Sequence, residues 1–364
     1  VVLFTISFYA LNAQVVINEF SASNLKSYPD DYAKYEDWVE LYNMGNESVD
    51  LEGWFITDKE SKPYKWSFPE GIIISPKGYI VVWCSGRDSV SSSGIHTNFK
   101  LTQTQGDDIV MLSNSNGALQ DQADLKLVLA AQSVARAQNG ETPWLICTEP
   151  TLGSSNNSSE KYEGLAPTPV IQLDAGFYEG SQKTKIDFDE NFYKVRYTTN
   201  GNEPDENSSL YIANTDILIQ STTSLKAKAF PIDNNNLLPS KIDFKTFFID
   251  ESFTVPVFSV AADKIQDLAN GQGELRPIGT LEYFNEDGER TAVSYGELNR
   301  HGQDSWILPH RSLDWISRDE MGYNKAVFEE LFTYSDRDEY QILTMKVAVT
   351  YEMNLYILWL RRVA

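Results

Sequence analysis

Short apolar or alternating runs, separated by turn residues, dominate the chain from Val15 to about residue 157. The runs Asp37–Tyr42 and Gly78–Trp83 are typical. Turn-forming residues stand between such runs, as in the stretch Asn114–Gly117, because Asn, Ser and Gly adopt turn conformations at low cost. Repeated short strands with turns of this kind predict an all-β sandwich over residues 15–157.

A second block with strand-like patterning follows a polar stretch. Residues 158–164 are expected to form a linker, because they are rich in Ser and charged residues. Beyond them, Val195–Pro204 is typical of a strand that enters an Asn-Gly turn. Thr223–Phe230 alternates apolar and polar residues, which predicts a half-buried strand. We therefore expect a second, smaller sandwich over residues 165–250.

The first 14 residues have a different character. The apolar run Val1–Asn12 ends at Ala13 and Gln14, which is typical of the end of a secretory signal. A buried first strand is the alternative, but a new strand pattern begins at Val15. We expect residues 1–14 to be a signal-peptide remnant and the protein to be secreted or located at the cell surface. No continuous apolar run reaches the ~20 residues that span a bilayer, so no transmembrane segment is expected.

Composition narrows the range of partners and metal sites. The 364 residues carry a net charge of −22, which argues against nucleic acid, since phosphate binding depends on Lys and Arg. Cys84 and Cys147 are too few for a disulfide scaffold, and either a single bridge or two free thiols fits the sequence. The three histidines are too scattered to indicate a metal triad. The identity of any bound metal stays unknown.

Several separated motifs in the first block resemble the lamin-tail domain. They occur in the expected order and are Ile17–Phe20, Asp37–Asn43, Val49–Trp54, His96–Leu101 and Pro150–Ser154. The resemblance implies an immunoglobulin-like sandwich and leaves its partner open. Glu19 and Glu40 stand among apolar neighbours within these motifs. They could act as ligands, but we favour carboxylates that accept hydrogen bonds within the fold.

The second block resembles the chitobiase/hexosaminidase C-terminal-type module. The residues that carry the resemblance are Gly176–Gly180, Ser208–Tyr211 and Pro239–Lys241. The resemblance implies a fibronectin-like accessory module without catalytic residues. It also raises the alternative of a carbohydrate-binding accessory protein.

The third block, residues 251–364, resembles the front part of a CotH-type kinase-like domain. The likeness rests on His301–Ser305, Pro309–Leu313 and Arg318–Gly322. It implies nucleotide binding with ATP and Mg²⁺, in which Gly302 approaches the phosphates, Ser305 donates a hydrogen bond and Arg311 supplies the cation.

Arg311 departs from the family at this point, because many members have Lys there, and the two side chains differ in reach and geometry. Pairing of Arg311 with Asp314 or Asp319 is an equally supported alternative.

The family's metal-binding carboxylates have no counterpart in this block. After Asp338 and Glu339, the remaining carboxylate side chain is Glu352. We therefore expect no catalytic residues, and a truncated domain that is poorly ordered because half of its core is missing.

The predicted fold class is mainly β: two immunoglobulin/fibronectin-like sandwiches followed by a partial α+β kinase-like domain. The predicted function is that of an exported multi-modular protein with binding or spacer sandwiches and an inactive kinase-like segment. An active secreted CotH-type kinase is the alternative in the enzyme class. An extracellular protein or a glycan is the expected partner.

Overall fold

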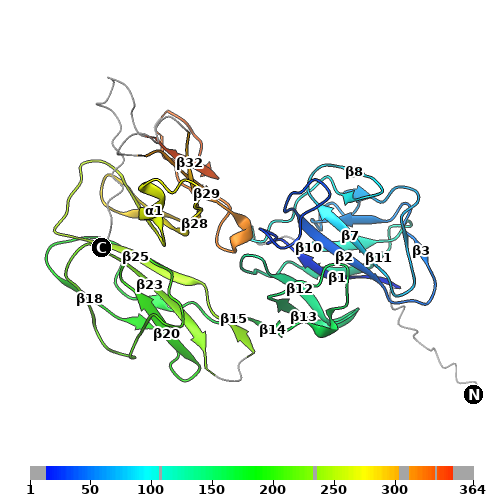
Figure 1. Ribbon diagram of the computed structural model, residues 1–364, viewed down its shortest axis with the longest axis horizontal. Coiled ribbons are helices and arrows are strands. Elements are labelled where there is room, and N and C mark those ends of the chain that lie inside the picture. The colour runs from blue at the N-terminus through cyan, green and yellow to red at the C-terminus, as the bar shows by residue number, and fades with distance from the viewer. Residues whose placement is uncertain (1–13, 106–108, 233–235, 303–310, 333, 347–364) are drawn as a thin grey trace, which may run out of the picture. The chain divides into compact units, whose positions relative to one another are not determined.

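The computed structural model describes residues 14–105, 109–232, 236–302, 311–332 and 334–346 (Figure 1). The predicted signal-peptide remnant therefore lies almost entirely outside the described residues. The chain forms two compact units, Val1–Lys161 and Tyr162–Ala364. The division falls inside the predicted linker, and the predicted second and third domains share the second unit. The finer domain boundaries stay a prediction.

The first unit is built from strands of two to seven residues. They are β1 (Val15–Ser21), β2 (Asp37–Asn43), β3 (Val49–Asp50), β4 (Phe55–Thr57), β5 (Trp66–Ser67), β6 (Ile73–Ile74), β7 (Tyr79–Cys84), β8 (Ser89–Val90), β9 (Ile95–His96), β10 (Ile109–Ser113), β11 (Leu119–Asp124), β12 (Ser133–Gln138) and β13 (Glu141–Cys147). A 3-10 turn at Asn156–Ser158 and strand β14 (Lys161–Tyr162) follow.

Strands β1 and β2 form the centre of this unit. The larger sheet runs β14-β13-β12-β1-β2-β7-β9-β8, and a second sheet runs β11-β10-β4-β5. Every residue of β1 and β2 is buried, so both faces of these strands are covered. Their antiparallel register places Glu19 directly opposite Glu40. Polar side chains on such strands need partners inside the protein, because burial removes their water.

The second unit begins with the module that was predicted over residues 165–250. Its strands are β15 (Gly164–Leu165), β16 (Val170–Ile171), β17 (Gly176–Tyr178), β18 (Gln182–Thr184), β19 (Ile186–Asp187), β20 (Tyr193–Thr198), β21 (Ser209–Leu210), β22 (Ile217–Ile219), β23 (Thr223–Pro231), β24 (Leu237–Leu238) and β25 (Ile242–Ile249). The main sheet runs β17-β25-β23-β20-β21. One of its faces contributes Val195, Leu225, Ala227 and Phe247 to a buried apolar core.

A further sheet completes the second unit. Its elements are β26 (Val257–Ala262), α1 (Ile265–Ala269), β27 (Ile278–Phe284), β28 (Arg290–Arg300), β29 (Leu313–Ser317), a 3-10 turn at Asp319–Met321, β30 (Val327–Phe328), β31 (Glu339–Tyr340) and β32 (Ile342–Met345). The strands are ordered β26-β27-β28-β29-β32, all antiparallel. Leu281, Leu298 and Trp315 pack with Leu268 of α1 in a core of their own.

This sheet corrects the expectation that the third block is poorly ordered. Trp315, Leu298 and Leu313 are fully buried, because α1 and the segment around Val327 cover one face of the sheet. The described part of residues 251–346 therefore has a small apolar core of its own. The prediction of a mainly β protein is confirmed, whereas the α+β kinase-like assignment stays a prediction.

The other face of this sheet packs on the second sandwich module through a polar layer. Lys226 Nζ of β23 donates to the Ala261 carbonyl of β26 at 2.8 Å. Thr246 Oγ1 of β25 lies 2.7 Å from Ser259 Oγ of β26. The prediction of β23 as half-buried was therefore wrong, because the polar side of this strand is covered by a second sheet rather than by water.

No helix in the described part of the chain has the length and apolarity needed to cross a bilayer.

Candidate functional site

The residues expected to contact phosphate lie at the connection between β28 and β29. Arg300 pairs with Leu313, and His301 N donates to the Ser312 carbonyl at 3.0 Å, so Gly302 and Arg311 lie next to the paired ends of β28 and β29. Gly302 has φ +66°, a backbone conformation that favours glycine. Ser305 lies outside the described residues. The structure thus brings Gly302 and Arg311 near the same strand ends, and their nucleotide role stays a prediction.

The side chain of Arg311 points toward α1. Its Nη1 donates to the carbonyl oxygen of Ala269, the last residue of that helix. A cation at this place is favourable, since the last carbonyls of a helix carry partial negative charge. Asp314, one of the carboxylates weighed as a partner of Arg311, accepts from His301 Nδ1 at 3.0 Å and from Thr344 Oγ1 at 2.7 Å.

A cluster that sequence reasoning missed joins His96 to the loop after β1. His96 Nε2 lies 2.6 Å from Asp31 Oδ1, and His96 Nδ1 lies 2.9 Å from Ser85 Oγ. The hydrogen bond from His96 holds the pKa of Asp31 below its usual range. Asp30 adds a third group of metal-ligating type within 4.8 Å. No sequence pattern indicates this cluster, because His96 and Asp31 are 65 residues apart.

The carboxylate of Asp30 already has hydrogen-bond donors within the protein. Its Oδ1 accepts from the backbone N–H groups of Tyr32 and Lys34 at 2.9 and 2.8 Å. Its Oδ2 accepts from Arg87 Nη1 at 2.8 Å. Because the guanidinium and two amides occupy this carboxylate, the cluster is a hydrogen-bonded brace for the loop, and it does not present three available ligands to a cation.

The buried carboxylates of β1 and β2 act as hydrogen-bond acceptors, as expected. Glu19 accepts from Ser133 Oγ at 2.5 Å and from Thr151 N at 3.0 Å. Glu40 accepts from Asn18 Nδ2 at 2.8 Å and from Gly153 N at 2.5 Å. Burial raises the pKa of Glu19, and burial together with Glu19 raises the pKa of Glu40 to about 8.

A second group of buried charges lies in the polar layer of the second unit. Lys226 is 1% exposed, and burial lowers its pKa to about 8, against the attraction of Glu203 and Glu282. Glu282 is bound by Arg290 Nη1 at 2.8 Å and by Thr246. Burial nevertheless raises the pKa of Glu282. Glu282 and Arg290 pair with each other, and the bonds of Lys226 to Ala261 and of Thr246 to Glu282 join the two sheets, which is a structural role.

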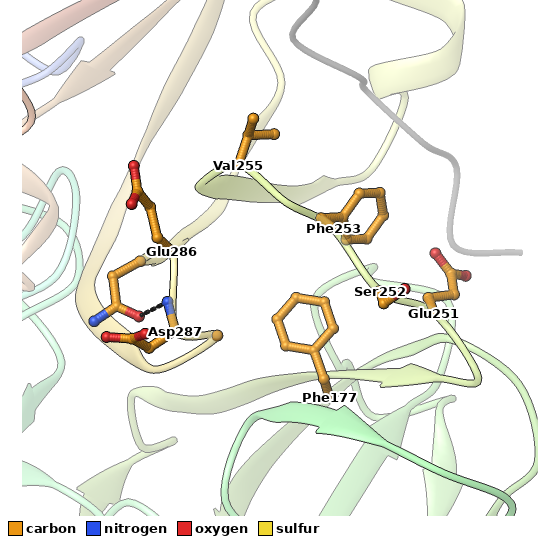
Figure 2. A pocket seen from close by; sticks show the side chains of 9 residues that line it. Phe177, Glu251, Ser252, Phe253, Val255, Glu286 and Asp287 are labelled. Carbon is orange, nitrogen blue, oxygen red and sulfur yellow. Dashed lines mark hydrogen bonds between the residues drawn. The ribbon is translucent and has the colours of Figure 1, made fainter.

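A shallow pocket of about 140 Å³ lies between the second module and the third sheet of the same unit (Figure 2). Phe177 forms its floor and stacks on Phe248, with ring centroids 4.5 Å apart. Glu251, Glu286 and Asp287 contribute carboxylates to the lining. Aromatic faces beside acceptors suit sugar hydroxyls, whereas a phosphate would be repelled, because the lining residues include no Lys, Arg or His. Glycan binding stays a prediction.

The two cysteines are free thiols, and both are buried. Burial raises the pKa of Cys84 well above its ordinary value and also raises that of Cys147. Buried thiols of this kind are weak nucleophiles, because the thiolate is the reactive form.

Two family models match the chain. Residues 10–126 match the Lamin Tail Domain, and residues 173–238 match the Chitobiase/beta-hexosaminidase C-terminal domain. The resemblances of the first and second blocks to these two families are therefore confirmed, and the chain is a mainly β protein with one segment similar to each module. The kinase-like resemblance of the third block stays a prediction. No curated protein matches the chain.

Proposed function

We propose that this protein is an exported, multi-modular binding and spacer protein whose kinase-like segment does not catalyse phosphoryl transfer. The observation that carries the proposal is the use of the buried charged groups. Lys226, Glu282, Glu19 and Glu40 each bond to neighbouring strands or loops of the scaffold. Buried charged groups that are used in hydrogen bonds within the scaffold support a scaffold role over a catalytic one.

The arrangement of the second unit supports the spacer part of the proposal. The second module and the sheet after it share hydrogen bonds across their interface, including Arg290 Nη1 to the Phe244 carbonyl at 3.0 Å and Ile242 N to Tyr323 Oη at 2.8 Å. Two sheets joined in this way resist bending better than modules joined by a flexible linker. A rigid body of this kind would hold a binding surface at a fixed place.

Export is tested by locating the protein in cells that produce it naturally. We expect the full-length protein in the culture medium or on the cell surface, where added protease degrades it without lysing the cells. A cytoplasmic enzyme measured in the same fractions controls for leakage. Recovery of the protein in the cytoplasmic fraction, protected from added protease, would refute export.

We also expect no phosphate transfer from ATP. Positioning and charge neutralisation supply nearly all catalysis in phosphoryl transfer, and these 364 residues show no recognisable pair of metal-binding carboxylates after the Arg318–Gly322 motif. Labelled ATP with Mg²⁺ or Mn²⁺ should give no incorporation above background. Residual ATP binding, if measured, should be abolished in Arg311→Ala.

Arg276→Ala is the matched control, because Arg276 lies in the same block, outside the motifs of the resemblance, and donates to the exposed carbonyls of Gly273 and Leu275 at 3.1 and 2.8 Å. Metal-dependent labelling that disappears in Arg311→Ala and persists in Arg276→Ala would identify an active kinase.

A further inference from the structure

The segment after β13 is held to the first unit mainly by polar contacts. Thr151 and Gly153 donate their backbone N–H groups to Glu19 and Glu40. Asn156 Nδ2 donates to the Asn18 carbonyl at 3.0 Å, and Asn156 N donates to Asn139 Oδ1 at 2.9 Å. Within residues 150–156, Asn156 alone is buried. With so little apolar burial, attachment of this segment depends on its hydrogen bonds.

The two carboxyl groups that receive this segment are unusual in their surroundings. Both are 0% exposed and lie directly opposite each other on β1 and β2. Their hydrogen-bond donors are neutral hydroxyl, amide and backbone groups. Two buried carboxylates without a hydrogen-bonded cation cannot both ionise without a large cost, because like charges repel strongly in a poorly solvated site.

We propose that Glu19 and Glu40 form a proton-dependent clasp that holds residues 150–156 against the first unit and releases them when the pair loses its proton. The first unit ends at Lys161, five residues after this segment, and the second unit begins at Tyr162. This inference does not depend on the proposed export or on kinase activity.

The direction of the pH effect follows from the raised pKa values. A carboxyl group with a raised pKa stabilises the folded state fully below its unfolded value of 4.5, and this contribution is lost as the pH rises through the folded value. For Glu40 the folded value is about 8. Hydrogen bonds from the segment favour the ionised carboxyl groups, but the cost of burying the charge is larger, and release of the segment would let water solvate it. The clasp is therefore closed at pH 6 and opens as the pH rises toward 9.

Other titratable groups face this pair. Lys161 lowers the pKa of Glu19 by its charge, whereas the carboxyl groups contribute to the raised pKa values of Tyr28, Tyr79 and Cys147. Glu149 lies close enough to raise the pKa of Tyr28 as well. The two tyrosines and Cys147 titrate at higher pH than Glu40, so the carboxyl pair opens first.

Hydrogen exchange of the full chain tests the clasp. The backbone N–H groups of Thr151, Gly153 and Asn156 are followed at pH 6, 7, 8 and 9, with rates corrected for intrinsic exchange. Protection of these amides should fall about tenfold or more between pH 6 and pH 9, since a tenfold change corresponds to one pKa unit. In Glu40→Gln, which keeps an acceptor oxygen and cannot ionise, protection should change less than about threefold.

Amides of β2 and β7 in the same samples report whether the sandwich itself stays folded. Unchanged protection of residues 150–156 in the wild type would overturn the proposal. The same loss in Glu40→Gln as in the wild type would also overturn it, because another group would then be responsible. If Glu40→Gln does not fold, Glu19→Gln provides the same comparison from the other side of the pair.

Discussion

Replacement of Trp315 by alanine should lower the free energy of unfolding of the second unit by about 3–5 kcal/mol, the usual cost of a fully buried Trp. Trp315 is 0% exposed at the centre of the third sheet, and its Nε1 donates to Ser294 and Ser317 at 3.2 Å each. The substitution removes the largest side chain of that core and leaves two buried hydroxyl groups with one partner fewer. Urea denaturation followed by far-UV circular dichroism measures the change.

The loss of stability in Trp315→Ala should extend beyond the third sheet. Lys226 and Thr246 of the second module bond directly to β26, so disruption of that sheet exposes polar groups that the module had buried. Hydrogen exchange should show that amides of β23 and β25 lose protection together with those of β27 and β28. The expectation is one cooperative transition, because each sheet covers a face of the other.

Phe328→Ala is the matched control. Phe328 lies in the same unit but is 50% exposed, so its removal should change the free energy of unfolding by less than about 1 kcal/mol. An equally small change in Trp315→Ala would contradict a packed core in the third sheet. Loss of protection limited to residues 257–345 would contradict the cooperative coupling with the second module.

The sequence predicted the strands better than their surroundings. The run Asp37–Tyr42 was identified as a strand, and it forms all but the last residue of β2. The expectation that Glu19 and Glu40 accept internal hydrogen bonds is confirmed, because carboxyl groups amid apolar neighbours must find partners wherever the chain places them. Local pattern was enough for these features.

Pairings between distant segments could not be predicted in this way. Lys226 stands at a polar position of an alternating strand, where a lysine facing water gives the same pattern as a lysine facing a second sheet. The contact of His96 with Asp31 likewise depends on how two loops meet. Such features follow from tertiary packing, and residue spacing along the chain carries no information about them.

The prediction that the third block is poorly ordered was wrong for a related reason. It assumed that the apolar strands needed the other half of a kinase-like domain as a partner. In the structure, α1 and the segment around Val327 cover one face, and the second module covers the other. Apolar strands identify what must be buried, but they do not identify the segment that buries it.

Replacement of Arg290 should also lower the free energy of unfolding of the second unit strongly, and the size of this loss should depend on pH. Glu282 is 1% exposed, and Arg290 Nη1 binds its Oε1 at 2.8 Å. In Arg290→Met the carboxylate loses this cation, and breaking a buried ion pair from one side costs about 3–5 kcal/mol. We expect about 3 kcal/mol at pH 8, the lower end of that range, because Arg290 itself is partly exposed. Urea denaturation measures the loss.

The sign of the pH dependence follows from Glu282. Burial already raises its pKa, and loss of Arg290 raises it further, because the guanidinium favours the ionised form. The unfolded carboxyl group has a pKa of 4.5, so the protonated form is retained at no cost below that pH. The deficit of Arg290→Met should therefore be largest at pH 8 and shrink steadily as the pH falls toward 5.

The double variant Glu282→Gln/Arg290→Met distinguishes two contributions to this loss of stability. One is the unpaired charge of Glu282, and the other is the lost packing of the arginine side chain. The glutamine side chain introduced by Glu282→Gln is neutral and could still accept from Thr246 N, which lies 3.2 Å from Glu282 Oε1. The double variant should be more stable than Arg290→Met at pH 8, and its stability relative to the wild type should vary little with pH. If the single and double variants lose the same free energy at pH 8, the burial of an unpaired carboxylate is not the cause. The polar layer would then hold the two sheets together by packing and neutral hydrogen bonds, and the charge of Glu282 would contribute little to it.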